Sequence, residues 1–235
     1  MSPTPFSADT VRKRYQHYIE EQERLHRRDL RALLRLDIIP SETYAVYERW
    51  LPEDGVDMLL IAEAPPWRGV GDPHRYRYFY NPDQAPITGM SREIFAGLGI
   101  RGGTKQECLE AFRQRGLFLT DTIKCIVNKD LRAHIPRSLI EYSARTLLAD
   151  EIGRLDPGTI GLLGSTALHA LASIEPYASE FGDSRTIRDA VLRQREQVFR
   201  IDGRSVIVSP YPSVRNDRRA ITEAFRLLGE HTRRR

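Results

Sequence analysis

The chain has 235 residues, a hydrophobic fraction of 40% and a formal net charge of +4. The hydrophobic content is ample for one core, yet no apolar run approaches the roughly 18 residues that a membrane-spanning helix needs. The first ten residues lack the basic and apolar regions of a secretory signal. These features argue against a membrane or secreted protein, and we expect a cytoplasmic one.

The cysteine and histidine content argues against two further classes. The only cysteines, Cys108 and Cys125, are too few for a disulfide framework or a cysteine-built zinc site. The six histidines are scattered and form no recognisable pair of metal ligands. We therefore expect neither a metal nor a cofactor, and nothing in the sequence suggests anything but a monomer.

The N-terminal part is predicted to be helical and rich in arginine. A long charged helix is expected over residues 7–36, and a second one over 41–50 with Ser41 as its N-cap. Arginine suits phosphate groups, which favours DNA as a partner, although acidic residues in the same helix fit a solvated face equally well. The arginines gather in two places: Arg12, Arg14, Arg24, Arg27, Arg28, Arg31 and Arg35, then Arg215, Arg218, Arg219, Arg233, Arg234 and Arg235.

Four apolar runs of strand length follow along the chain. They cover residues 57–63, 116–125, 158–164 and 204–210. Helical patterns over 105–115, 137–153 and 166–173 separate them. Strands that alternate with helices predict a three-layer α/β/α sandwich around a central four-stranded parallel sheet.

The turn signals and the absence of a linker complete the predicted organisation. Asp202-Gly203 is predicted to form a hairpin turn that leads into the last strand. No linker divides the chain, so residues 1–235 are expected to form a single domain. Within it, residues 1–55 are a helical extension and 56–235 the α/β core.

Ligands of parallel α/β sheets bind beyond the carboxyl ends of the strands. Polar residues and tight turns stand at just these ends, over residues 63–67, 121–124, 164–165 and 209–216. The long segment 66–90, rich in Pro, Gly, Arg and Tyr, is of a length that is often functional in loops. The sequence therefore predicts one site formed by these segments.

In chain order, the strand ends resemble motifs of the uracil-DNA glycosylase superfamily, above all its family-four branch. The run LLIAEAPPW at 59–67 is similar to a water-binding Gly-Glu-Ala-Pro-Gly loop, with Ala62 and Pro66 in place of the glycines. FLTDTIKC at 118–125 is similar to a Thr-Asn-Val-Val-Lys-Cys segment, with Asp121 in place of the base-reading Asn. IGLLGSTALHAL and SPYPSVRN follow in the expected order, with Tyr211 in place of the His of a His-Pro-Ser motif.

The resemblance covers roughly residues 57–225 and implies a DNA glycosylase, which flips a base out of DNA and hydrolyses its N-glycosidic bond. One departure concerns the iron–sulfur cluster of the family-four branch. Cys125 stands at one ligand position, but Ala144 occupies another and no cysteine precedes Cys108. Because a cluster needs its thiolates, we predict none.

Three residues are predicted to carry the chemistry. Glu63 would polarise a water and stabilise the cationic sugar, unless it only caps a loop. An ionised Asp121 offers acceptors only, so it favours a base with an exocyclic amino group over uracil, unless it only caps a turn. Tyr211 would remain a neutral donor toward O2 of the base.

Further residues are predicted to surround the base and the DNA. The compact Pro66 leaves room for a substituent at C5, which points to 5-modified cytosines of the kind found in some phage DNA, and hence to defence. The expected base-binding residues are Ala64, Pro65, Pro66, Trp67, Phe79, Tyr80 and Asn81; because Ile87 stands at the family's platform position, Phe79 or Tyr80 is expected to stack on the base. The expected DNA-binding residues are Ser91, Arg92, Ser165, Pro212, Ser213, Val214, Arg215 and Asn216.

Three alternatives stay open. The chain is an ordinary uracil-DNA glycosylase that tolerates Asp121, or a DNA-binding module that has kept the fold without catalysis. A lyase that also nicks DNA would need a nucleophilic amine, for which Lys124 is the only lysine near the site.

Overall fold

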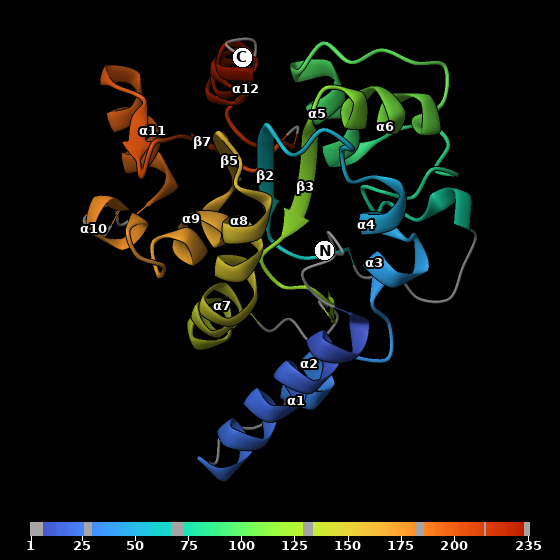
Figure 1. Ribbon diagram of the computed structural model, residues 1–235, viewed down its shortest axis with the longest axis vertical. Helices are drawn as coiled ribbons and strands as arrows, with labels where there is room; N and C mark the ends of the chain where they lie inside the picture. Colours follow the sequence, from blue (N-terminus) through green and yellow to red (C-terminus); the bar gives the residue numbers. More distant parts are fainter. Residues whose placement is uncertain are drawn as a thin grey trace.

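The computed structural model describes residues 7–25, 30–66, 73–128, 134–181, 186–213 and 215–232. Its central sheet has the strand order β3-β2-β5-β7-β6, with helices on both faces (Figure 1). The parallel strands are β2 (Met58–Ala62), β3 (Leu117–Asp121), β5 (Thr159–Leu163) and β7 (Arg204–Ser209). These are the four predicted strands, and they confirm the α/β/α sandwich.

The prediction of four strands is one short, because the hairpin adds a strand to the sheet. β6 (Phe199–Ile201) pairs antiparallel with β7 through the turn Asp202-Gly203. Both turn residues have positive φ, 51° and 77°, which is the backbone of the tight turns that suit a two-residue hairpin. Beyond the end of β6, the side-chain amide of Gln194 replaces the missing strand partner and bonds both the N–H and the C=O of Val208.

The helices of the core follow the predicted pattern closely. Two short irregular helices accompany them: a 3₁₀ turn η1 (Pro73–Arg75), and a π-helical turn η3 (Ala144–Leu148) that joins α7 to α8. The core helices are α5 (Gly89–Gly97), α6 (Lys105–Gln114), α7 (Arg137–Ser143), α8 (Ala149–Leu155), α9 (Ser165–Leu171), α10 (Tyr177–Phe181), α11 (Ile187–Glu196) and α12 (Arg218–Thr232).

The N-terminal extension differs from the two helices that were predicted. α1 (Ala8–Arg24), capped by Ser7, is followed by α2 (Leu30–Leu33) and by β1 (Leu34–Arg35), which pairs antiparallel with β4 (Ile126–Val127). The second helix is broken into α3 (Pro40–Thr43) and α4 (Val46–Arg49) by a positive φ at Ala45. Ser41 therefore lies inside α3 and is not an N-cap.

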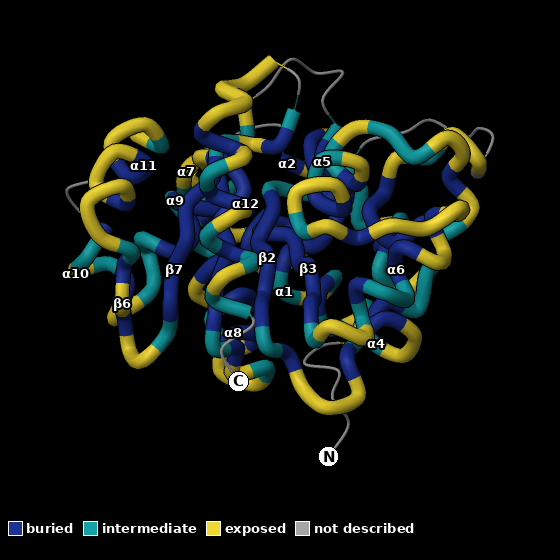
Figure 2. The backbone as a smooth tube through the Cα atoms, turned by 90° about the horizontal axis from the view of Figure 1, so that it is seen from above, coloured by how far each residue is buried: buried dark blue, intermediate teal, exposed yellow. Residues whose placement is uncertain are grey.

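Two hydrophobic clusters hold these parts together. The strands and the helices around them form the main one, and Figure 2 shows the strands as dark blue segments inside exposed outer turns. The second cluster joins α1, α2 and β1 to Ile123, Cys125, Val127, Leu139 and Leu147 of the core, and Tyr15 is fully buried within it. The hydroxyl of Tyr15 bonds Ser143 at 2.7 Å and accepts the N–H of Lys124 at 2.9 Å. The extension is thus packed directly behind the end of β3.

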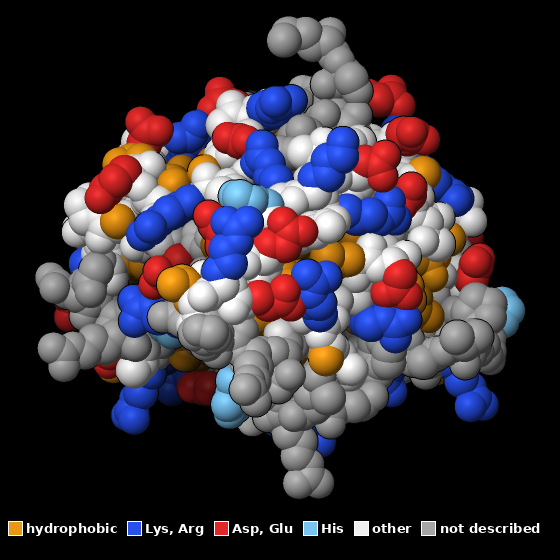
Figure 3. Space-filling model, turned by 90° about the horizontal axis from the view of Figure 1, so that it is seen from below, with side chains coloured by type: hydrophobic (Ala, Val, Ile, Leu, Met, Phe, Trp, Pro, Cys, Tyr) orange, Lys and Arg blue, Asp and Glu red, His pale blue; other side chains and the backbone are white. Residues whose placement is uncertain are grey.

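Arginines of the N-terminal extension lie next to acidic side chains. Arg12 bonds Asp9 and Glu42, and Arg31 bonds Glu23. The face toward which β3 points in Figure 1 is drawn in Figure 3, where basic and acidic side chains are interleaved. This part of the arginine cluster fits the solvated-face alternative. None of the helices described is long and apolar enough to cross a membrane.

Candidate active site

The carboxyl ends of the four parallel strands lie level with one another. Ala62 pairs with Asp121, and Leu163 pairs with Ser209. The sheet ladder continues one step further, since the N–H of Ile123 bonds the carbonyl of Glu63 at 2.9 Å. Residues far apart in the sequence are thereby brought to one edge of the sheet, as the sequence predicts.

A cavity of about 750 Å³ opens at this edge. The loop after β2, the start of α5, the start of α9 and the loop after β7 form its walls. Of the predicted site residues, Glu63, Ala64, Pro66, Arg92, Ser165, Tyr211, Pro212, Ser213 and Arg215 line it. Its size is that of a ligand pocket and exceeds the space that one base needs.

Glu63 is held in a defined orientation on the cavity wall. Its carboxylate is half-buried, and Oε2 accepts the hydroxyl of Thr166 at 2.8 Å. Thr166 lies in the first turn of α9, which begins directly after β5. A carboxylate fixed in this way can orient a water without reorganising during the reaction.

Tyr211 approaches the same wall because the residue beside it is a glycine. Gly164 has φ of 98°, and a Cβ at this position would lie 3.3 Å from Cβ of Tyr211. Tyr211 is 42% exposed and lines the cavity. Partial burial, and then the charges of Asp121 and Glu63, raise the pKa of Tyr211 above its ordinary value. The phenol is therefore a neutral donor within electrostatic range of both carboxylates.

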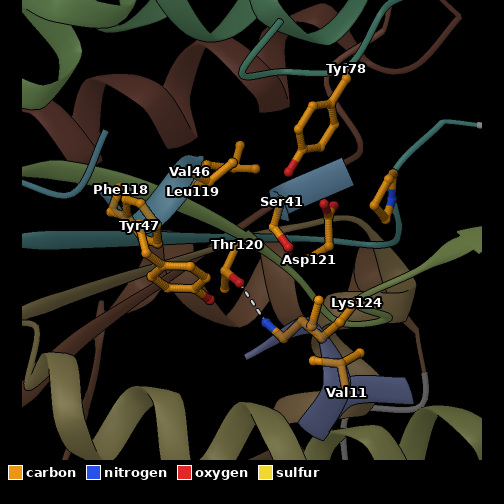
Figure 4. A pocket seen from close by; sticks show the side chains of 12 residues that line it. Val11, Ser41, Val46, Tyr47, Tyr78, Phe118, Leu119, Thr120, Asp121 and Lys124 are labelled. Atoms are coloured by element: carbon orange, nitrogen blue, oxygen red, sulfur yellow. Dashed lines mark hydrogen bonds between the residues drawn. The ribbon is translucent and has the colours of Figure 1, made fainter. Parts of the chain in front are cut away.

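Asp121 lies next to the large cavity, in a smaller chamber of about 40 Å³. The two cavities share the loop after β2 as a wall, because Pro65 lines the small one while Ala64 and Pro66 line the large one. In Figure 4 the hydroxyls of Ser41 and Tyr78 gather around the carboxylate of Asp121. Asp121 is 8% exposed and lines this chamber, so a group that enters the chamber can reach its side chain.

The predicted aromatic platform is wrong. Phe79 and Tyr80 are buried in the main cluster, and the hydroxyl of Tyr80 bonds the backbone of Leu119. Tyr76 and Tyr78 from the same segment lie closer to the site instead. Their rings stack at 6.1 Å, and the charge of Asp121 contributes to the raised pKa of both.

Asn81 also has a structural role and does not read a base. Its side chain is buried, donates to the carbonyl of Tyr76 at 2.8 Å and accepts the N–H of Asp83 at 3.2 Å. The Asn-Pro pair thus forms a turn that fixes the aromatic segment. Ile87 packs against the main cluster.

The predicted DNA contacts divide into three groups. Ser91 is only 1% exposed within α5, and Asn216 braces the loop by donating to the carbonyl of Tyr211 at 2.7 Å. The prediction for Ser91 is therefore wrong, whereas the exposed Asn216 stays a predicted DNA contact. Val214 lies outside the described residues, as does Trp67 of the predicted base-binding set. The remaining residues of this set line the cavity, as described above.

Sequence reasoning missed several residues of the wall. Arg77, Thr88, Met90, Glu93 and Thr166 all line the large cavity. Arg77 alternates with the tyrosines in RYRYFY, and this alternation was the one signal for a segment with two faces. For Thr166 there was no local signal, because its partner Glu63 lies 103 residues away in the sequence.

Residues 57–228 match the family model of the Uracil DNA glycosylase superfamily. The chain belongs to this superfamily. A comparison with curated proteins finds no match. The superfamily acts on DNA, and membership suggests DNA glycosylase activity. The matched residues include the whole parallel sheet and leave the N-terminal extension outside.

The iron–sulfur cluster of the superfamily's family-four branch does not fit the residues present. Such a cluster needs four thiolates, and the chain has two cysteines. Cys108 packs in the main cluster and Cys125 in the second, so the two do not share a site. Burial raises the pKa of both thiols, which disfavours the thiolate form.

A buried ion pair lies beneath the chamber of this glycosylase fold. Lys124 donates to Glu151 and to the hydroxyl of Thr120, and Tyr47 also donates to Glu151. The ammonium of Lys124 is thereby engaged by a carboxylate. This contact argues against Lys124 as the nucleophile of a lyase.

We expect Lys124→Met to lower the free energy of unfolding by about 3–5 kcal/mol, because it leaves the Glu151 carboxylate buried without its counter-charge. The double variant with Glu151→Leu should recover much of this loss. Urea unfolding followed by circular dichroism measures both. Arg226→Met, which removes exposed ion pairs on α12, is the control and should cause no comparable loss. If Lys124→Met lowered the free energy of unfolding no more than Arg226→Met does, the stabilising role of the Lys124–Glu151 ion pair would be contradicted.

Lys105 supports the aromatic segment from below. Its buried Nζ donates to the carbonyl of Tyr78 and to Oε1 of Gln84, both at 2.6 Å. Burial lowers the pKa of Lys105 from 10.5 to about 7. Between these two values the unfolded chain binds the proton and the folded one does not, so stability gained from this group rises with pH.

Lys105→Met is therefore expected to remove a pH dependence. From pH 7 to pH 10 the wild type should gain roughly 3–4 kcal/mol of unfolding free energy relative to the variant. Urea titrations of both proteins at several pH values measure this difference. Lys13→Met, at an exposed position of α1, should show no such trend. A constant difference between wild type and Lys105→Met would show that Lys105 keeps its proton in the folded state.

Proposed function

We propose that this protein is a monofunctional DNA glycosylase that removes an amino-bearing base, a cytosine with a substituent at C5, by attack of water. The observation that carries the proposal is the meeting of Glu63, Tyr211 and Asp121 at one edge of the sheet. Glu63 and Tyr211 line the large cavity, Asp121 lines the chamber next to it, and the charges of both carboxylates contribute to the raised pKa of Tyr211. The cavity there is large enough for an extruded nucleotide.

The reaction follows from these groups. As the C1′–N bond breaks, its electron pair leaves with the base and the sugar becomes cationic. Glu63, oriented by Thr166, stabilises this cation and accepts a proton from the water that attacks C1′. Tyr211 donates a hydrogen bond to O2 of the departing base, where negative charge develops. The neutral phenol lacks the positive charge that a protonated histidine would have. Stabilisation of the transition state therefore depends more on Glu63 and on the phosphates of the bound DNA, whose negative charge stabilises the sugar cation.

The choice of base rests on Asp121. A carboxylate can only accept hydrogen bonds when ionised, so it suits the N4 amino group of cytosine and repels O4 of uracil. Pro66 is compact and lines the large cavity next to the chamber of Asp121, which leaves room at C5. Removal of such bases suits a defence against phages that modify their cytosines.

The phosphates have basic partners at the cavity. Arg77, Arg92 and Arg215 lie on its wall. Glu93 bonds Arg92 at 2.8 Å and Arg218 at 2.7 Å, which places these guanidinium groups side by side. Arginines spaced around a cavity mouth suit the backbone on either side of an extruded nucleotide.

The test is a set of single- and double-stranded DNAs that carry cytosine, 5-substituted cytosines or uracil. Free bases are identified by mass spectrometry, and abasic sites are scored by alkaline cleavage. We expect release of a 5-substituted cytosine and no strand nicking without alkali. Release of uracil alone would indicate an ordinary uracil-DNA glycosylase, and DNA binding without any released base would indicate a binding module.

A further inference from the structure

The chamber at Asp121 is built jointly by the superfamily core and the N-terminal extension. Its lining residues before position 57 come from α1, α3 and α4 and include Val11, Ser41 and Tyr47. The superfamily match begins at residue 57, so these residues are outside it. Tyr78, Asp121 and further residues of β3 form the opposite side. The extension therefore forms part of the wall of the chamber at Asp121.

The chamber wall is fixed in place by the second hydrophobic cluster. β1 pairs with β4 just after β3, and Tyr15 bonds both Ser143 and the backbone of Lys124. α3 is also tied to α1, because Arg12 bonds Glu42 at 2.8 Å. A wall with these bonds on both sides can define the shape of a subsite.

Among its apolar side chains the chamber lining carries polar groups that combine donors with acceptors. The hydroxyls of Ser41 and Tyr78 and the carboxylate of Asp121 face one another across the chamber (Figure 4). Burial and the charge of Asp121 keep Tyr78 protonated by raising its pKa. Lys124 forms its ion pair with Glu151.

We infer that this chamber is a subsite for a small, uncharged, polar substituent on the base, such as a one-carbon alcohol at C5 of cytosine. The inference rests on the proposed function and adds to it that Ser41, from the extension, determines which substituent is accepted. An alcohol group can donate to Asp121 while it accepts from Ser41 or Tyr78. A carboxyl group at the same carbon would be repelled by Asp121.

The size of the chamber supports a small occupant. Its volume is about 40 Å³, whereas a single water needs about 10–15 Å³ on the same scale. A shallow groove on the outer side shares Ala8, Ser41, Val46 and Tyr47 with the chamber. One layer of side chains thus separates the chamber from the surface, and a bulky substituent would have to displace it.

The test measures affinity separately from excision. Duplexes carry a 2′-fluorinated nucleotide, which resists cleavage of the glycosidic bond, with cytosine, 5-hydroxymethylcytosine or 5-carboxylcytosine as the base. Fluorescence anisotropy gives the Kd of each. For the wild type we expect about tenfold tighter binding of the hydroxymethyl base than of cytosine, and weaker binding of the carboxyl base than of either.

Two substitutions address Ser41 itself. Ser41→Leu fills the chamber and should abolish the preference for the hydroxymethyl base while binding of the cytosine duplex changes less than threefold. Ser41→Ala, which removes the hydroxyl without adding bulk, should reduce the preference several-fold. Thr43→Leu, at an exposed position of the same helix, is the control and should leave the preference unchanged.

The outcomes separate this inference from the proposed function. The subsite would be overturned if Ser41→Leu lost affinity equally for all three duplexes. It would also be overturned if the wild type bound the carboxyl base as tightly as the hydroxymethyl base. Excision is scored in parallel on duplexes with ordinary nucleotides. Selective binding without excision would support the subsite and contradict the proposed catalysis. Excision without selective binding would support catalysis and contradict the subsite.

Discussion

Glu63→Gln is expected to abolish base excision while DNA binding stays within a few-fold of the wild type. The amide keeps the size of the side chain and can still contact Thr166, but it can neither accept a proton from water nor balance the charge of the sugar cation. Loss of a group with both roles should lower kcat by about 1000-fold or more. Single-turnover assays on the released base give kcat, and anisotropy on the same DNA gives Kd.

A matched control for Glu63 lies on the same cavity wall. Glu93 also lines the cavity, but its carboxylate is engaged by Arg92 and Arg218. Glu93→Gln should therefore lower kcat far less than Glu63→Gln. If the two variants lost activity to the same extent, the effect would come from the summed charge of the cavity and not from a catalytic carboxylate.

Thr166 links the position of Glu63 to the fold. The hydroxyl donor comes from α9, which follows β5, while Glu63 follows the neighbouring strand β2. Two adjacent parallel strands therefore deliver the carboxylate and the group that orients it. The neighbouring strand β7 contributes Tyr211 from the loop after its end. Gly164, which follows β5, has no side chain and so allows Tyr211 to lie close to this pair.

The strand ends could be predicted from the sequence because two strong rules coincide there. Buried parallel strands have nearly continuous apolar runs, and ligands bind beyond their carboxyl ends. Glu63 is the first polar residue after its apolar run. Asp121 and Tyr211 are each the second polar residue after theirs. Their common level in the sheet then follows from pairing alone.

The aromatic segment could not be predicted in the same way. RYRYFYNP offers several rings, and the sequence does not say which of them face the main cluster. The bond from Tyr80 to Leu119, which joins residues 39 positions apart, decides this together with the local turn at Asn81. The position of Ser41 at the chamber could not be predicted for a similar reason. Nothing near Ser41 in the sequence indicates that its hydroxyl lies in the same chamber as Asp121, which is 80 residues further along.

The second large effect is expected from Asp121→Asn, which should reverse the choice of base. An amide offers the donor that O4 of uracil requires, whereas the carboxylate offers acceptors only. Sites that hydrogen-bond a substrate group discriminate strongly against analogues that lack it. We therefore expect the ratio of kcat/KM for uracil to that for the amino-bearing base to rise at least about 100-fold, or roughly 3 kcal/mol.

The substitution changes one atom in a side chain that is 8% exposed, so its effect on the shape of the chamber is small. Asp83→Asn, at an exposed position after the aromatic segment, is the control and should leave the ratio unchanged. Competition assays with both bases in one mixture measure the ratio directly and cancel differences in active protein. If Asp121→Asn lowered both rates together, Asp121 would be holding the loop and another group would read the base. Since Ser41 and Tyr78 face the same chamber, they would be the next residues to substitute.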